Sequence, residues 1–201
     1  MIFAILTLFF PLSGLDFSVS AAPEPFGTVK QIVGKAKANK NVLKEGDIVF
    51  KGQVIETEEK SVVKILLQAS LGAIQIGPNS EFQTDSTSKS KTSIQLVKGS
   101  LLSTIRKSVL SKEKKNYEVK TPKVSMGVRG TTFFVSQSQE GTTYQCICEG
   151  EVETVWPGGK DRKISKHHDH YRSFTAKEGT PEKDIGRDHT DEEINSLKSL
   201  L

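Results

Sequence analysis

The sequence lacks the short motifs that identify most enzymes. It contains no nucleophile elbow, no phosphate-binding glycine loop, no HExxH helix and no pair of carboxylates placed as a catalytic acid and base. It also has only two cysteines, and no C-x-x-C-H motif for attaching heme. These absences argue against an enzyme, and we expect a noncatalytic protein.

An excess of charge of one sign is also missing. The 28 Lys and Arg residues are mixed with 24 Asp and Glu along the chain, and the formal net charge is only +4. Proteins that bind nucleic acid usually carry a basic stripe or patch, and none is found here. The densest cationic segment, SKEKK at 111–115, is expected to be a solvated loop. We therefore expect no nucleic-acid partner.

Long apolar runs are absent after the amino terminus. The first residues, MIFAILTLFFPLSGL, form an apolar segment shorter than the roughly 20 residues of a membrane-spanning helix. The following DFSVSAA places Val19 and Ala21 as in a small-x-small cleavage site, although no Lys or Arg precedes the apolar run. This pattern favours a signal peptide over residues 1–21 rather than a buried helix. It predicts a periplasmic or secreted protein with no membrane span after cleavage.

The chain does contain many short β-branched runs. From Phe26 to Val155 they alternate with Gly, Asn, Ser and Lys, which is typical of an all-β domain. Turns are predicted at 45–47, 77–80 and 97–100. A weak echo between IQIGPNSEF and IQLVKGSLL suits strands stacked as imperfect repeats. We predict an all-β domain of many short strands over residues 22–156, with a solenoid-like or sandwich-like arrangement.

Several short motifs occur in a fairly specific order. They are GTV (27–29), LKEGD (43–47), KGQVIET (51–57), SVVKI (61–65), IGPNSE (76–81), LVKGS (96–100), YEVKTP (117–122) and GVRGTTFFV (127–135). The ordered set resembles the FecR domain family, and GVRGTTFFV is its most characteristic part. The resemblance covers residues 26 to about 152. It implies an all-β periplasmic module, and the best understood members relay a signal from an outer-membrane receptor to a cytoplasmic sigma factor.

Two departures limit what this resemblance implies. Such regulators place a helical, sigma-binding segment and a membrane span before the domain, and here only the signal-like stretch precedes it. Where the family has an Asp-Gly-Ser turn that leads into a strand, this chain has QASLGAIQIG at 68–77. The resemblance therefore implies a stand-alone exported module with a binding or signalling role. Its expected partner is an envelope protein or a small ligand.

The segment GVRGTTFFV predicts a tight turn into a strand. Gly127 and Gly130 permit positive φ on either side of Arg129, so the chain can bulge before a strand that starts at Thr131. In that strand Phe134 would face away from its two neighbours. Arg129 is expected either to pair with a carboxylate in a structural role or to bind a ligand through its planar guanidinium. These four residues, 127 and 129–131, form the predicted binding or structural motif.

The two cysteines lie on either side of one isoleucine in TTYQCICEG. In a strand, Cys146 and Cys148 point to the same face with Cα atoms about 6.7 Å apart. This separation is at the outer limit for a disulfide, which would be strained and easily reduced. Two thiolates on one face can instead chelate a metal without distortion. Three alternatives stay open: a metal-binding or redox-active pair, a strained disulfide, and buried thiols.

All four histidines follow the cysteines in the sequence. A hairpin through WPGGKD (156–161) could bring KHHDH (166–170) beside the cysteine strand. The spacing is not that of a standard zinc finger, but thiolates with imidazole suit zinc or copper. The predicted ligands of a metal site are Cys146, Cys148, His167, His168 and His189, with the pair His168 and His170 as an alternative source of imidazole.

The last residues, HTDEEINSLKSLL, predict a short helix after a linker or irregular strap. Thr190 is placed to cap the first turn, and Glu193 can reach back to it. The helix has one apolar stripe, formed by Ile194, Leu197, Leu200 and Leu201. It is expected either to dock on the β domain, which would place His189 near a fixed surface, or to bind a partner. Residues 157–201 are thus predicted to be a histidine-containing extension, a linker and a C-terminal helix.

Overall fold

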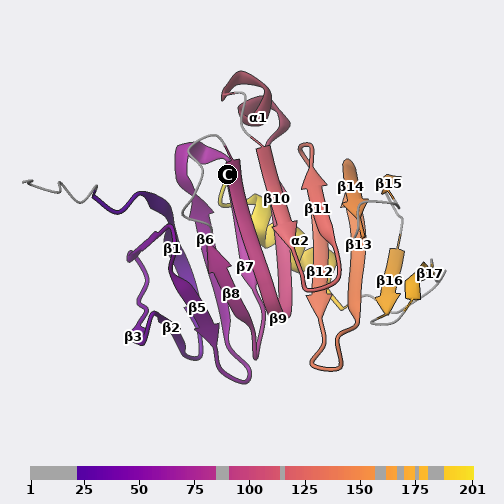
Figure 1. The fold of residues 1–201 in the computed structure, drawn as a ribbon. Helices are drawn as coiled ribbons and strands as arrows, with labels where there is room; N and C mark the ends of the chain where they lie inside the picture. Colours follow the sequence, from indigo (N-terminus) through magenta and orange to yellow (C-terminus); the bar gives the residue numbers. More distant parts are fainter. Residues whose placement is uncertain are drawn as a thin grey trace, which may run out of the picture.

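The computed structural model describes residues 22–84, 91–113, 116–156, 162–166, 170–174, 177–180 and 188–201. The predicted signal peptide therefore lies outside the described residues. Within them the chain forms a continuous sheet of seventeen strands, one 3-10 turn and two short helices (Figure 1). The predicted all-β class and the C-terminal helix are confirmed. No helix in this part of the chain is long and apolar enough to cross a membrane.

The strands are β1 Pro25–Val33, β2 Ala36–Ala38, β3 Asn41–Val42, β4 Ile48–Phe50, β5 Val54–Thr57, β6 Val62–Leu67, β7 Gly72–Ile76, β8 Glu81–Thr84, β9 Lys91–Ile105, β10 Asn116–Lys120, β11 Ser125–Val128, β12 Thr132–Gln137, β13 Thr143–Glu149, β14 Glu151–Val155, β15 Arg162–Lys166, β16 His170–Phe174 and β17 Lys177–Thr180. The helical elements are η1 Gln68–Ser70, α1 Lys107–Glu113 and α2 Asp191–Lys198.

The sheet curls into two layers that share the long strand β9. Layer A has the order β4, β1, β6, β7, the second part of β9, β12, β13, β16 and β17. Layer B has the order β3, β2, β5, β8, the first part of β9, β10, β11, β14 and β15. Only β9 and β10 pair in parallel among these ladders.

The strand β9 bends where it passes from layer B to layer A. A turn was predicted at 97–100, and this prediction is wrong because the segment lies inside one continuous strand. Gly99 has a φ of +89°, and a Cβ atom there would lie 2.1 Å from the Oγ atom of Ser80. Glycine is required at this bend both for its backbone conformation and for the close approach of Ser80.

The main core lies between the two layers. Strand β6 shows how the sequence builds it, because alternate residues Val63, Ile65 and Leu67 are buried while their neighbours are only half-buried. Two aromatic pairs join the layers edge to face. Their ring centroids are 5.9 Å apart for Phe26 and Phe82, and 6.5 Å apart for Tyr117 and Phe133.

A second, smaller apolar cluster lies on the outer face of layer A, under α2. Its buried members are Ala73, Leu102, Phe134, Tyr144, Cys146 and Leu197. Phe134 faces this cluster while its two neighbours face the main core, as the strand alternation predicts. The ribbon of α2, in yellow, crosses behind the strands of the sheet (Figure 1). The C-terminal helix is therefore docked on the β domain.

Two segments differ from the sequence expectations. The expected solvated loop at 111–115 is helical over its first three residues, which close α1. Beyond residue 157, where a linker or strap was expected, β15 pairs with β14 and β16 pairs with β13, so each of them extends one layer. The placing of a domain boundary at residue 156 stays a prediction.

Candidate functional site

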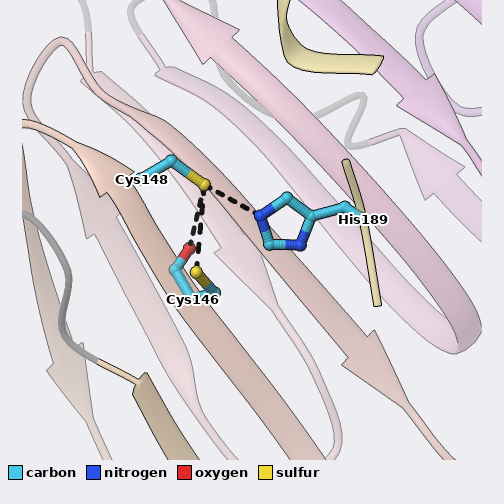
Figure 2. Close-up of side chains that lie close together, drawn as sticks. All are labelled: Cys146, Cys148 and His189. Carbon is cyan, nitrogen blue, oxygen red and sulfur yellow. Dashed lines mark hydrogen bonds between the residues drawn. The ribbon is translucent and has the colours of Figure 1, made fainter. Parts of the chain in front are cut away.

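Cys146 and Cys148 lie near the end of β13, on the face that α2 covers (Figure 2). Ile147 and Glu149 stand opposite consecutive residues of β12, so Cys148 is the extra residue of a β-bulge. The two Sγ atoms are 3.9 Å apart, about twice the length of a disulfide bond of ~2.0 Å. The pair is therefore not joined by a disulfide in this structure.

His189 approaches the two sulfurs from the C-terminal segment. It lies directly before Thr190, whose Oγ1 atom accepts a hydrogen bond from the Glu193 amide at 3.2 Å. The Glu193 carboxylate in turn accepts from the Thr190 amide at 2.9 Å, which completes the predicted capping box. This box fixes the direction in which the chain enters α2. It thereby holds His189 with its Nε2 atom 3.1 Å from the Sγ atom of Cys148 (Figure 2).

Two of the three residues, Cys146 and His189, are shielded from water, and Cys148 is half-buried. Cys146 and His189 are only 3% and 6% exposed, and the imidazole stacks on Phe134 with a centroid distance of 4.7 Å and an interplanar angle of 20°. The Nδ1 atom of His189 is buried and has no hydrogen-bond partner among the described residues. Leaving a buried polar atom without a partner costs about 1–3 kcal/mol. Packing and the contact with Cys148 must offset that cost.

Three soft ligand atoms thus lie together, all within 4.8 Å of one another. Zinc bound at about 2.3 Å from each sulfur and about 2.05 Å from a nitrogen, in a tetrahedral arrangement, would separate the sulfurs by about 3.8 Å and each sulfur from the nitrogen by about 3.6 Å. The sulfur separation of 3.9 Å already matches. The contact from Cys148 to His189 at 3.1 Å is shorter, and the separation of Cys146 from His189, within 4.8 Å, is longer, so the ring would have to shift away from Cys148 and toward Cys146 to admit an ion.

The other predicted ligands are placed less fully. His167 and His168 lie outside the described residues, so their roles as metal ligands stay predictions. His170 begins β16, and its backbone stands opposite Cys146 in the register of β13 and β16. The strand that follows the predicted hairpin is β15, and it pairs with β14 rather than with the cysteine strand, since Val155 pairs with Arg162. The chain returns beside the cysteine strand one strand later, with β16.

The GVRGT segment lies at the end of layer B. Gly130 has a φ of +68°, whereas Gly127 lies inside β11 and does not have a positive φ. The prediction of positive φ is thus confirmed at Gly130 and wrong at Gly127. Thr131 is buried, and its Oγ1 atom donates to the carbonyl of Glu151 at 2.7 Å and accepts from the amide of Glu151 at 3.1 Å. Thr131 therefore ties the turn before β12 to the start of β14.

A groove of about 280 Å³ lies beside this segment, with Gly127 among its lining residues. The other lining residues are Asn116, Tyr117, Glu118, Ser125, Val128, Arg129, Glu153 and Val155. The side chain of Arg129 is 71% exposed, and its guanidinium nitrogen is 4.0 Å from the Glu153 carboxylate. Glu118 is held in place by Ser125, whose hydroxyl donates to it at 2.8 Å. The groove therefore presents charges of both signs, and Arg129 is paired with a carboxylate while staying accessible.

Comparison with known proteins assigns the family. The profile of the FecR protein family matches residues 53–153, half of the chain. This chain belongs to the FecR family. Two crystal structures of a candidate anti-sigma factor from Parabacteroides distasonis, at 1.65 Å and 2.50 Å resolution, are similar to it. They share 16% and 15% sequence identity with it, with a TM-score of 0.54 in each case.

Each of these matches covers 63% of this chain and 57% of the other chain. This chain therefore spans little more than half the length of the structures that it matches, and at this identity the likeness shows the fold alone. A search of curated proteins found no match.

The FecR segment contains part of each candidate site. Gly127, Arg129 and both cysteines lie inside the matched residues, whereas His189 lies beyond them. The cysteine and histidine cluster therefore joins the FecR segment to the C-terminal extension. The spacing of cysteines and histidines does not predict that His189 meets Cys148, because 41 residues separate the two. Only the docking of α2 brings them together.

Proposed function

We propose that this protein is a noncatalytic binding and signalling module of the FecR type that works in the cell envelope. Membership of the FecR family is the observation that carries the proposal. The similarity of fold to a candidate anti-sigma factor supports a regulatory role exerted through contact with another protein. The signal-like first 21 residues support a periplasmic or secreted location. The expected partner is an envelope protein or a small ligand.

The groove around Gly127 is the surface we propose for that partner. It lies beside the most characteristic FecR segment and is lined by Arg129, Glu118 and Glu153. Paired charges at a rim give specificity and faster association more than raw affinity. Because Gly127 carries no side chain, the groove has room for a group from the partner. A Cβ atom at Gly127 would meet only Glu153, at an ordinary 3.9 Å.

Site-specific photo-cross-linking tests this surface in cells that export the full chain. A photo-reactive amino acid replaces Asn116, an exposed residue that lines the groove and is not one of its charged side chains, and in a control protein it replaces the exposed Lys30 on β1. We expect a defined adduct from the groove position alone. Adding Gly127→Leu should remove it by filling the groove, while Gly127→Ala should preserve it. Identical adducts from both positions, or an adduct that survives Gly127→Leu, would contradict the proposal.

A second function is favoured by the cluster of Cys146, Cys148 and His189. We propose that the module also binds zinc or copper there, or uses its thiol pair in redox chemistry. Two thiolates and one imidazole are a soft ligand set that selects zinc or Cu(I). The distance of 3.9 Å between the sulfurs supports this proposal, because it suits a shared ion better than a disulfide.

Elemental analysis combined with thiol titration tests this second function on protein exported to the periplasm. We expect close to one zinc or copper ion per chain, lost in Cys146→Ser and reduced in His189→Phe. A further loss in His168→Ala would add that predicted residue to the ligands. Two titratable thiols without an ion would refute the metal proposal, and two thiols that stay titratable after treatment with a disulfide oxidant would refute the redox proposal as well. No ion and no thiols would favour the redox pair in its oxidised form.

A further inference from the structure

We infer that an ion held by Cys146, Cys148 and His189 acts as a latch that fixes α2 over the outer face of layer A. The inference rests on the proposed metal function. Two of the ligands belong to β13, and the third lies directly before Thr190, the residue that caps α2. An ion bound by all three would therefore cross-link the sheet to the start of the helix.

Within the described part of the chain, one fully buried side chain and a small set of polar contacts hold α2 on the sheet. The helix has only eight residues, and isolated helices of that length are unstable in water. Leu197 is fully buried, but Ile194 and Leu200 are only partly so. Two hydrogen bonds join it to the sheet, an exposed one from Lys64 to Ser196 at 2.6 Å and a part-buried one from Gln75 to Glu193 at 2.8 Å. Lys198 forms an exposed ion pair with Glu149, and Arg106 donates to the carbonyl of Leu201 just after the helix. Exposed ion pairs contribute little to stability. One additional tether at the start of α2 would consequently change how often the helix leaves the sheet.

The helix covers side chains that would otherwise form an apolar surface. These are Ala73, Leu102, Phe134 and Tyr144, which come from four neighbouring strands of layer A. Contiguous exposed apolar patches on soluble proteins mark surfaces for contact with other molecules. The ion would thus control whether this face is covered by α2 or open. This is a second surface, on the layer opposite the groove around Gly127.

The contacts of His189 suit a metal ligand better than a residue that serves only for packing. A purely structural aromatic ring stacked on Phe134 would need no nitrogen, yet this one directs Nε2 to Cys148 (Figure 2). Its buried Nδ1 atom has no partner among the described residues, so the imidazole carries a cost that phenylalanine would avoid. His189→Phe is therefore a matched variant that keeps the stack and removes the ligand.

Hydrogen–deuterium exchange of the full chain tests the latch, with zinc and Cu(I) as separate arms and a chelated sample as the reference. When α2 leaves the sheet, His189 is withdrawn and only the cysteine pair remains to bind the ion. The ion binds the docked state more tightly than the undocked state, so a saturating ion should slow exchange of the 191–200 amides by the ratio of the two dissociation constants. The dissociation constant of His189→Phe stands for the undocked state, and that of the wild type for the docked state. We expect at least a ten-fold slowing, and none in His189→Phe. Amides of β12 serve as the internal control.

The outcomes separate the latch from the metal function. If wild-type protein binds the ion but exchange of α2 changes less than two-fold, the latch is wrong and the metal function stands. If neither ion binds the wild type, the metal function fails, and the latch fails with it. Slowing in one metal arm alone shows which of the two ions fixes α2. Should Cys146→Ser fold poorly because Cys146 is buried, Cys148→Ser at the half-buried bulge position removes the chelate instead.

Discussion

Three glycine-to-alanine variants separate backbone strain from close approach in this fold. Gly130 has a φ of +68°, and a Cβ atom there would lie 2.2, 2.5 and 2.8 Å from Cβ, Cα and N of Lys107. Gly46 has a φ of +91° but nothing within 4 Å of the added atom. Gly127 has neither a positive φ nor a close neighbour. The three positions therefore differ in one physical feature at a time.

The expected magnitudes follow from those differences. An L-residue in the left-handed region costs about 1–2 kcal/mol, which is the whole effect expected for Gly46→Ala. At Gly130 the added atom also meets the backbone at the start of α1, and relieving such overpacking costs a further 1–3 kcal/mol or so. Gly130→Ala should thus lower the free energy of unfolding by roughly 2–5 kcal/mol. Gly127→Ala should leave it unchanged or raise it by up to about 1 kcal/mol, because alanine restricts the unfolded chain.

Urea unfolding followed by the fluorescence of Trp156 measures all three variants. Trp156 is the only tryptophan and packs against the main core. The order of stability should be Gly127→Ala, then Gly46→Ala, then Gly130→Ala. If Gly130→Ala is no less stable than Gly46→Ala, the close approach to Lys107 is wrong. A loss of more than 1 kcal/mol or so in Gly127→Ala would mean that this position needs glycine for stability, against the strand conformation found here.

Three further variants test single contacts. Burial raises the pKa of Tyr117 above its ordinary value, although its hydrogen bond with Ser103 acts in the opposite sense. The folded state therefore favours the neutral phenol, so this contribution to stability is complete below about pH 10 and falls above it by up to about 1.4 kcal/mol per pH unit. Tyr117→Phe should make the alkaline loss shallower in urea titrations at pH 9–11, and an unchanged slope would refute this. Thr190→Ala removes the cap of α2 and should cost about 1 kcal/mol of helix docking, seen as roughly five-fold faster amide exchange in α2 alone; faster exchange throughout the sheet would contradict a local role. Ser80→Ala should lower the free energy of unfolding by about 1–3 kcal/mol, because the buried Ser80 hydroxyl donates to the carbonyl of Gly77 at 2.8 Å and accepts from the amide of Ser100 at 3.0 Å; a change below about 0.5 kcal/mol would show that water replaces it.

Much of the sheet could be predicted because its signal is local. Alternate burial in β6 and the opposite orientations of Phe133 and Phe134 follow from the two-residue period of a strand. The segment at 97–100 could not be assigned locally, because Gly and Ser suit a turn and a bent strand equally well. What decides between them is Ser80 on the neighbouring segment, whose hydroxyl accepts from the Ser100 amide at 3.0 Å and lies where a side chain at position 99 would stand.

The candidate site divides in the same way. Cys146 and Cys148 share a face because side chains two residues apart in a strand point the same way. The capping box is also predictable, because Thr190 and Glu193 are only three residues apart. The meeting of Cys148 with His189 depends on where α2 docks, which no local pattern encodes. Gly127 does not have the predicted positive φ because β11, which contains it, pairs with β10 and β14 and is extended there. This pairing depends on tertiary structure.

X-ray absorption at the zinc or copper edge tests most directly whether the two cysteines and His189 share one ion. The sample is the full chain purified from the periplasm without added metal. For zinc we predict two sulfur ligands at about 2.3 Å and at least one nitrogen at about 2.0–2.1 Å, with that nitrogen lost in His189→Phe and the sulfurs retained. A shell of oxygen and nitrogen alone, unchanged in Cys146→Ser, would show that the ion binds elsewhere and would contradict the proposed site.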